Sequence, residues 1–277
     1  MTRRPSLLAI LAAITAWFVA ESVVAQPIRP AAAAEPVTLD LCFEETPAVP
    51  WRSRQKQGLY FELLDEVARR LGLRVEYHPQ PWPFCLAEVG AGRMDGAFAV
   101  AFSPERRPVF AFPPGAPDVD ADALREDAIV LVRRRGTPVD VVDGQLVGST
   151  RPVGVQPGYA IADDLKRAGW AVEMSSRDHL VQLSRLSRGE LDAIALSAFR
   201  WAQLQAVGGV ALDGLEALPR PILTKRYFLG LSHAFVAAHP ALAQRLWATT
   251  REVRTSVAFR RREQAAIAEA LTPRSSP

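Results

Sequence analysis

This sequence has few cysteines, few histidines and a small net charge. Its 277 residues include only two cysteines and four histidines, and 33 basic residues against 30 acidic ones leave a net charge of +3. A balance this close to neutral argues against nucleic acid as a partner, because the phosphate backbone is bound through concentrated basic surfaces. No histidine falls at metal-ligand spacing from a cysteine, so the sequence predicts neither a metal site nor a cofactor.

A hydrophobic run long enough to cross a bilayer is also lacking. The apolar run Leu7–Ala20 covers about 14 residues, whereas a membrane-spanning helix needs about 20. Arg3 and Arg4 precede this run and small residues ending at Ala25 follow it, which is the pattern of a secretory signal peptide. We therefore predict cleavage after Ala25 and an exported, periplasmic protein. The alanines at 31–34 are a second cleavage site to consider, and a retained N-terminal anchor is the alternative.

The two cysteines, Cys42 and Cys85, are interpreted in the light of this export. In an oxidising compartment a pair of cysteines is typical of a disulfide, and two buried free thiols are the alternative. The bridge would close a loop of about 43 residues and stabilise the fold by about 4 kcal/mol in the chain-entropy model.

Hydrophobic periodicity predicts alternating strands and helices in the first hundred residues. Phe61, Leu64 and Leu71 share one helical face, and Gly72 follows where a left-handed cap is favoured. The other elements expected in this part are strands at 37–43, 73–77 and 94–102 and a helix beginning near Phe84. This order of strand, helix, strand, helix and strand is typical of an α/β fold.

A similar pattern recurs in the second half of the chain. Leu86–Ala97 and Leu183–Ile194 each contain the end of a helix, a glycine, an aspartate shortly afterwards and the start of an apolar strand. The further elements expected are strands at 128–132, 153–156 and 170–174, an apolar stretch at 222–231, and helices at 158–169, 179–187 and 242–257. The duplication predicts two similar α/β lobes rather than one continuous sheet, and chance resemblance between two strand–helix units is the alternative.

Several segments together resemble a known family. Gly58–Gly72 resembles the first helix of the type II periplasmic binding proteins, and more narrowly that of solute-binding protein family 3, the polar amino-acid receptors of ABC transporters. The segments that match further motifs of this family, in the expected order, are Pro81–Glu88, Gly92–Phe98, Ser103–Arg106 and Val153–Tyr159. Each motif alone is weak, but the ordered set covers nearly all of the chain after the signal peptide.

The resemblance implies a two-lobed α/β fold in which two crossing segments join the lobes and act as hinges. Residues 36–113 and 226–277 would form the first lobe and residues 114–225 the second, after a signal peptide at 1–25. The implied function is that of a monomeric periplasmic receptor, not an enzyme, which closes around a small polar, carboxylate-bearing solute such as an amino acid. The implied partner is an ABC-transporter permease in the inner membrane, to which the receptor delivers the solute.

Arg106 is the expected clasp for a ligand carboxylate, because a guanidinium group can donate two parallel hydrogen bonds to it. The resemblance puts Arg106 at the cleft edge; the neighbouring Arg107, or a surface pairing of Arg106 with Glu105, is the alternative. Trp82 stands where the family often places a side chain beside the ligand, and a core tryptophan is the alternative. Phe102, at the end of the preceding strand, is also expected to contact the ligand.

Two loops are expected to complete the cleft. Glu44, Glu45 and Trp51 follow the first strand, at the carboxyl edge of the sheet where ligands bind in α/β folds. One glutamate is expected to receive a ligand ammonium group, and two solvated acids are the alternative. Backbone amides at Gly158 and Tyr159 are expected to begin a helix and hold the ligand's anion, with an ordinary turn as the alternative.

One departure from the family pattern leaves the ligand open. Amino-acid receptors of this family commonly carry an aspartate a few residues after the second-lobe Asp-Ala, where it holds the ligand's amino group. Counting on from Asp192 reaches Ser197 instead, so Ser197 is the expected contact at this place. The sequence is equally compatible with an α-amino acid and with a carboxylate-bearing or aromatic solute that lacks an ammonium group.

Two other functions use the same fold. Some relatives are cyclohexadienyl dehydratases acting on prephenate or arogenate, and in such an enzyme Glu44 or Glu45 would serve as a general acid. The other function is that of a soluble ligand-sensing protein that signals through a membrane receptor. The sequence contains neither a Gly-x-Ser-x-Gly elbow nor a phosphate loop, which favours binding over catalysis.

Overall fold

The computed structural model describes residues 37–207 and 212–272, so the predicted signal peptide lies outside the described residues. No helix in these two ranges has the length and apolar character needed to span a bilayer. The described helices are α1 Leu59–Leu71, α2 Trp82–Gly90, α3 Ala160–Arg167, α4 His179–Ser187, α5 Ala198–Val207, α6 His233–Ala238, α7 Pro240–Thr255 and α8 Val257–Leu271. The described strands are β1 Thr38–Glu44, β2 Arg74–Gln80, β3 Gly96–Ala101, β4 Phe110–Ala111, β5 Arg125–Arg134, β6 Asp140–Val142, β7 Gln145–Val147, β8 Val153–Gly154, β9 Val172–Glu173, β10 Ala193–Ser197, β11 Leu215–Ala217 and β12 Leu223–Ser232.

Ten of the described strands form one sheet whose two ends repeat the same order. From the first end the order is β2-β1-β3-β12, and from the second end it is β9-β8-β10-β5. In each case three parallel strands are followed by one antiparallel strand. The duplication that the sequence predicts is therefore present in the fold.

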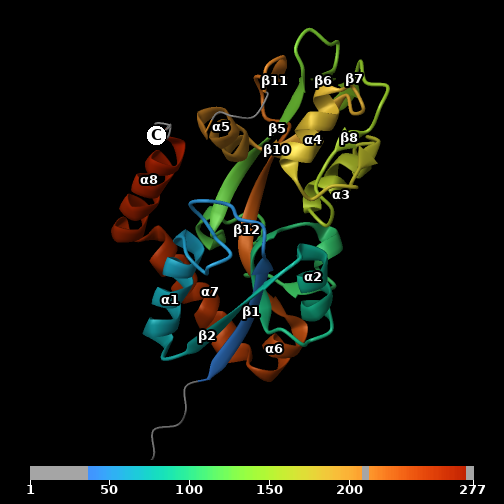
Figure 1. Cartoon of the computed structure of the whole chain (residues 1–277). Helices are drawn as coiled ribbons and strands as arrows, with labels where there is room; N and C mark the ends of the chain where they lie inside the picture. Colours follow the sequence, from blue (N-terminus) through green and yellow to red (C-terminus); the bar gives the residue numbers. More distant parts are fainter. Residues whose placement is uncertain (1–36, 208–211, 273–277) are drawn as a thin grey trace, which may run out of the picture. The chain divides into compact units, whose positions relative to one another are not determined.

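The two long strands β5 and β12 run between these ends (Figure 1). They pair with each other in antiparallel fashion, from Leu223 opposite Ile129 to Tyr227 opposite Arg125. Hydrogen bonding therefore continues through the whole sheet, and the expectation that two lobes would exclude a continuous sheet is wrong. The physical reason is length, because each strand has 10 residues and can pair both with its own end and with the other crossing strand. The lobe boundaries at residues 113 and 225 stay predictions.

The two repeated aspartates, Asp95 and Asp192, make equivalent hydrogen bonds at the two ends of the sheet. Asp95 accepts a hydrogen bond from the backbone N–H of Asp40 at 2.8 Å. Asp192 accepts bonds from the backbone N–H groups of Thr150 and Arg151 at 2.7 and 2.8 Å. Burial alone would raise the pKa of Asp192, but these bonds and nearby arginine lower it to about 2. Each carboxylate thus ties an earlier chain segment to the strand that follows the aspartate.

Separate hydrophobic cores fill the two ends. The first contains Phe43, Phe61 and Phe98, whose ring centroids lie 5.2 to 5.3 Å apart, and it is closed by α1 and α7. At the second end, successive residues of β5 serve two cores because side chains alternate along a strand. Leu131 packs in the core under α3, whereas Val132 packs in the core under α4.

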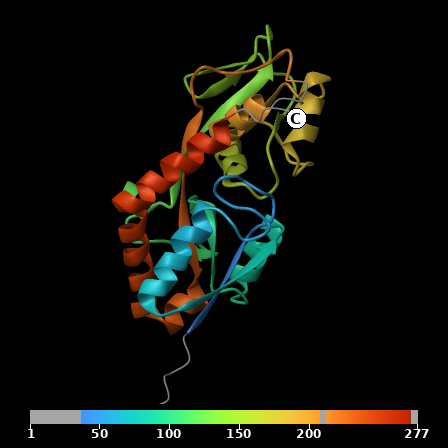
Figure 2. The same ribbon diagram turned by 60° about the vertical axis from the view of Figure 1, so that its left-hand side comes forward.

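The C-terminal region contains two helices where the sequence predicts one at 242–257. The first, α7, ends at Thr255, and the Ser256 hydroxyl then accepts a hydrogen bond from the backbone N–H of Phe259 at 3.1 Å, which caps α8. The apolar pattern of α8 is sparse, since Phe259 and Ala266 are its buried residues, and this explains why periodicity misses it. Helix α8 packs against both α1 and α5 (Figure 2).

The predicted disulfide is present. Cys42 on β1 and Cys85 on α2 are joined at an S–S distance of 2.02 Å, with their Cα atoms 5.7 Å apart, and both residues are fully buried. The bridge fastens α2 to β1, and it packs in the same core as Trp82.

Replacing Cys42 and Cys85 by alanine should lower the free energy of unfolding by about 4 kcal/mol, because the unfolded chain regains freedom that a closed loop of this length removes. Urea unfolding of the double variant and the parent, followed by tryptophan fluorescence, measures the difference. As a control, the denatured but unreduced parent should show no free thiol. Two titratable thiols in that sample would contradict the pairing.

Candidate functional site

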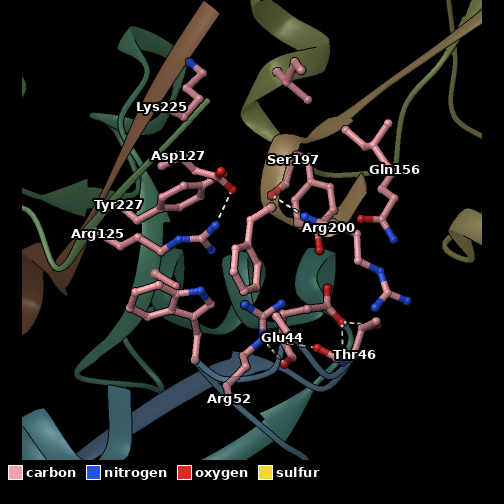
Figure 3. A pocket seen from close by; sticks show the side chains of 18 of the residues that line it. Glu44, Thr46, Arg52, Arg125, Asp127, Gln156, Ser197, Arg200, Lys225 and Tyr227 are labelled. Carbon is pink, nitrogen blue, oxygen red and sulfur yellow. Dashed lines mark hydrogen bonds and ion pairs between the residues drawn. The ribbon is translucent and has the colours of Figure 1, made fainter. Parts of the chain in front are cut away.

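A cavity of about 150 Å³ is lined by residues of both crossing strands and of both ends of the sheet. Its charged and polar side chains face one another from different elements (Figure 3). The residues with charged or polar side chains, apart from the aromatic ones, are Glu44, Thr46, Arg52, Arg106, Arg125, Asp127, Gln156, His179, Ser197, Arg200, Gln203 and Lys225. Within the described ranges, no cluster of His, Cys, Asp or Glu could hold a metal ion.

Glu44 organises the loop after β1. One carboxylate oxygen accepts hydrogen bonds from the backbone N–H and the hydroxyl of Thr46, at 3.0 and 2.9 Å. The other accepts from the backbone N–H of Trp82, at 3.1 Å, and so connects the loop to the start of α2. Arg52 crosses the same loop, where its Nε donates to the carbonyl oxygens of Glu44 and Thr46 at 3.0 and 3.2 Å. Both carboxylate oxygens of Glu44 are thus hydrogen-bonded to other groups of the protein.

Arg106 lies buried in the turn after β3, with 6% of its surface exposed. Its guanidinium donates to the carbonyl oxygens of Ala101 and Gly158, at 3.3 and 2.6 Å, and lies 5.4 Å from the ring centroid of Trp82. Burial lowers the pKa of Arg106 to about 10, although nearby Asp163 opposes the change. The group is therefore charged at neutral pH and lacks a carboxylate partner within the described ranges.

Arg125 and Asp127 form a buried pair on β5 (Figure 3). The Arg125 guanidinium lies 4.6 Å from the ring centroid of Trp51. The nearby Ser197 hydroxyl and the backbone N–H of Phe199 also favour the charged form of Asp127. Burial raises the pKa of Asp127, and Arg125 together with these donors acts against that rise.

The second end contributes Ser197, Tyr159, Arg200 and His179. The Ser197 oxygen accepts a hydrogen bond from the backbone N–H of Arg200 at 3.1 Å, at the start of α5. Burial raises the pKa of Tyr159, whose hydroxyl also interacts with Arg52 from the first end. Burial, and then the charge of Arg200, lower the pKa of His179 to about 4, so this side chain is neutral at pH 7.

Two buried indole N–H groups in the cavity wall have no acceptor. Trp51 and Trp82 line the cavity and are each only 3% exposed. Neither Nε1 atom has a hydrogen-bond partner in the described part of the chain. Buried donors are normally satisfied, so these two are available to an oxygen-rich ligand.

Six of the predicted site residues line this cavity, and three do not. The six are Glu44, Trp51, Trp82, Arg106, Tyr159 and Ser197. Glu45 instead pairs with Arg54 at 3.0 Å, and Phe102 packs on Phe112 with ring centroids 5.1 Å apart. Gly158 meets Arg106 through its carbonyl group rather than through an amide. The ligand-binding roles of all nine stay predictions.

Sequence reasoning missed five charged residues of the cavity wall. These are Arg52, Arg125, Asp127, Arg200 and Lys225. Arg52 is adjacent to the predicted site residue Trp51, so the sequence alone offers a reason to place Arg52 in the same cleft loop. Arg125 and Asp127 lie just before the apolar run that predicts a strand at 128–132. The observed strand, β5, begins three residues earlier, at Arg125, and so includes both.

Comparison with known proteins bears on both the fold and the family. Residues 44–124 match the family model of bacterial extracellular solute-binding proteins, family 3. A crystal structure of a histidine kinase sensor domain with similarity to periplasmic binding proteins aligns with a TM-score of 0.67 at 16% identity, covering 84% of this chain and 96% of that chain. Comparison with curated proteins gives no match.

Two further structures share the fold. An ABC uptake transporter substrate binding protein from Streptococcus pneumoniae with bound histidine has a TM-score of 0.64 at 18% identity, covering 85% of this chain and 94% of that one. An ancestral arginine-binding protein bound to arginine has a TM-score of 0.63 at 17% identity, covering 84% of this chain and 99% of that one. The predicted two-lobed fold is confirmed, and the resemblance to family 3 is confirmed over residues 44–124.

The pKa of His179 makes stability depend on pH. An unfolded histidine takes up its proton near pH 6.5, whereas folded His179 does so at about 4. As the pH falls from 6.5 towards 4, the unfolded state therefore binds more protons than the folded state, and the free energy of unfolding decreases.

His179→Gln should remove this contribution, so that the free energy of unfolding falls less steeply between pH 6.5 and 4, by at most about 1.4 kcal/mol per pH unit. Urea unfolding at several pH values in this range measures the slope. His233→Gln, which changes an exposed histidine outside the cavity, is the matched control. Equal slopes for parent and His179→Gln would contradict the assignment.

Proposed function

We propose that this protein, with its type II periplasmic-binding-protein fold, is a receptor that captures a small carboxylate-bearing solute in the cavity. Arg106 is the observation that carries the proposal. Its guanidinium is buried and charged, and it has no carboxylate partner in residues 37–207 or 212–272. Leaving a buried charge unpaired is unfavourable by several kcal/mol, and a ligand carboxylate would offset that penalty.

Closure around the solute is the second part of the proposal. Arg106 reaches from the first end to the Gly158 carbonyl, and the Gln203 amide donates to the carbonyl oxygen of Val49 at 2.7 Å. A solute that contacts both ends favours the arrangement in which they are close. The crossing strands β5 and β12 would supply the hinge.

Delivery to an ABC-transporter permease, residence in the periplasm and a monomeric state are proposed from the resemblance to family 3. The fold alone does not decide between transport and sensing, since a kinase sensor domain and a transporter receptor both have it. The match to a solute-binding family favours transport. Binding is favoured over dehydration by the state of Glu44, the candidate general acid. Both of its carboxylate oxygens accept hydrogen bonds from the protein.

Arg106→Ala should weaken solute binding by about 2 to 4 kcal/mol, or about 30- to 1000-fold, because truncation leaves the ligand carboxylate unpaired in a buried site. A thermal-shift screen of L-amino acids, dicarboxylates and aromatic acids identifies a bound solute, and titration calorimetry then gives the dissociation constant.

Arg107→Ala is the matched control, because Arg107 is exposed and lies over the Phe102 ring, 5.1 Å from its centroid, outside the cavity. It should leave the affinity unchanged. Unchanged affinity in Arg106→Ala, or an equal loss in both variants, would show that the carboxylate is held elsewhere.

A further inference from the structure

The cavity wall carries more positive than negative charge. Its cationic residues are Arg52, Arg106, Arg125, Arg200 and Lys225, and its acidic residues are Glu44 and Asp127. Two of the cations are neutralised by the protein, since Arg125 pairs with Asp127 and Lys225 pairs with Asp164. The guanidinium groups of Arg52, Arg106 and Arg200 form no ion pair in the described part of the chain.

The two acids both accept hydrogen bonds from other groups of the protein. Both oxygens of Glu44 accept hydrogen bonds, from Thr46 on one side and Trp82 on the other. Asp127 is paired with Arg125, whose guanidinium donates a hydrogen bond to it. An ammonium group on the ligand would find little acceptor capacity left on Glu44, whose Oε2 accepts one hydrogen bond, and it would lie among guanidinium groups that form no ion pair. The wall therefore disfavours a ligand with a positive charge.

The unpaired cations come from different elements. Arg52 lies in the loop after β1, Arg106 follows β3, and Arg200 belongs to α5 at the second end of the sheet. One carboxylate has two oxygens and can form a bidentate pair with one guanidinium at a time. The buried indole N–H groups of Trp51 and Trp82 add two more donors without acceptors. A single carboxylate therefore offers too few acceptor oxygens for this set of donors.

We propose that the ligand is a small dicarboxylate without an ammonium group, with one carboxylate held by Arg106 and the other by Arg200 together with Arg52. This inference rests on the proposed function, and it adds the number and sign of the ligand's charges. The cavity volume of about 150 Å³ suits a short molecule, since sites for drug-sized ligands begin at about 300 Å³.

The direct test compares ligands that differ in one charged group. Calorimetry on the purified chain uses malonate, succinate, glutarate and adipate, each with the monocarboxylate of the same carbon number. L-aspartate and L-glutamate add the ammonium group to succinate and glutarate. At least one dicarboxylate should bind about 100-fold more tightly than its monocarboxylate and more tightly than its amino-acid counterpart, and added salt should weaken it.

Arg200→Gln tests the second anchor. The Arg200 guanidinium makes no hydrogen bond to the described residues, so the variant should keep the parent's melting temperature without ligand. It should weaken the best dicarboxylate by about 10- to 100-fold and its monocarboxylate by less than about 3-fold, as expected for a lost charge-assisted hydrogen bond. Arg220→Gln is the matched control, since Arg220 is exposed and outside the cavity, and it should change neither affinity.

The outcomes separate the inference from the proposed function. Monocarboxylates or α-amino acids that bind as tightly as every dicarboxylate would overturn the inference and leave a carboxylate receptor in place. An Arg200→Gln variant that affects mono- and dicarboxylates alike would also overturn it. If no acid of any kind binds, the proposed function fails together with the inference.

Discussion

The antiparallel pairing of β5 with β12 is the constraint on which the cavity depends. Side chains alternate along a strand, so residues two apart share a face. Arg125, Asp127 and Ile129 of β5 and Lys225 and Tyr227 of β12 all line the cavity, and each set follows this spacing. A shift of one residue in the pairing would turn the charged set away from the cavity. The register of two strands thus determines which of their side chains face the cavity.

The remainder of the site is organised around buried positive charge. Arg106 keeps its proton although burial lowers its pKa to about 10, and aromatic rings cover it and Arg125. Backbone carbonyls, such as that of Gly158, supply part of the solvation that water would give. Glu44 and Asp127 orient neighbouring groups of the protein rather than neutralising Arg106. This buried positive charge is the feature on which the proposed binding of an anion rests.

Sequence patterns anticipated much of the fold. The Gly72 cap, the Cys42–Cys85 bridge and the duplicated order of strands and helices were predicted from the sequence, because each follows from residue type, spacing or a repeated pattern. Trp82 and Arg106 came from motif resemblance, and the structure places both in the cavity wall. Arg200 could not be identified in this way, because its position in the cavity wall depends on how the two ends of the sheet face each other. Helix α8 was missed because few of its residues are buried.

The contacts of helix α8 bear on the apparent affinity that the proposed receptor would have. It packs on α1 at one end of the sheet and on α5 at the other, so it touches both parts that hinge bending would separate. In the proposed hinge motion, opening would slide this helix or detach one of its contacts, and the strength of those contacts would add to the balance between open and closed forms. Under that proposal, substitutions on the outer face of α8 would change the apparent affinity without contacting the solute.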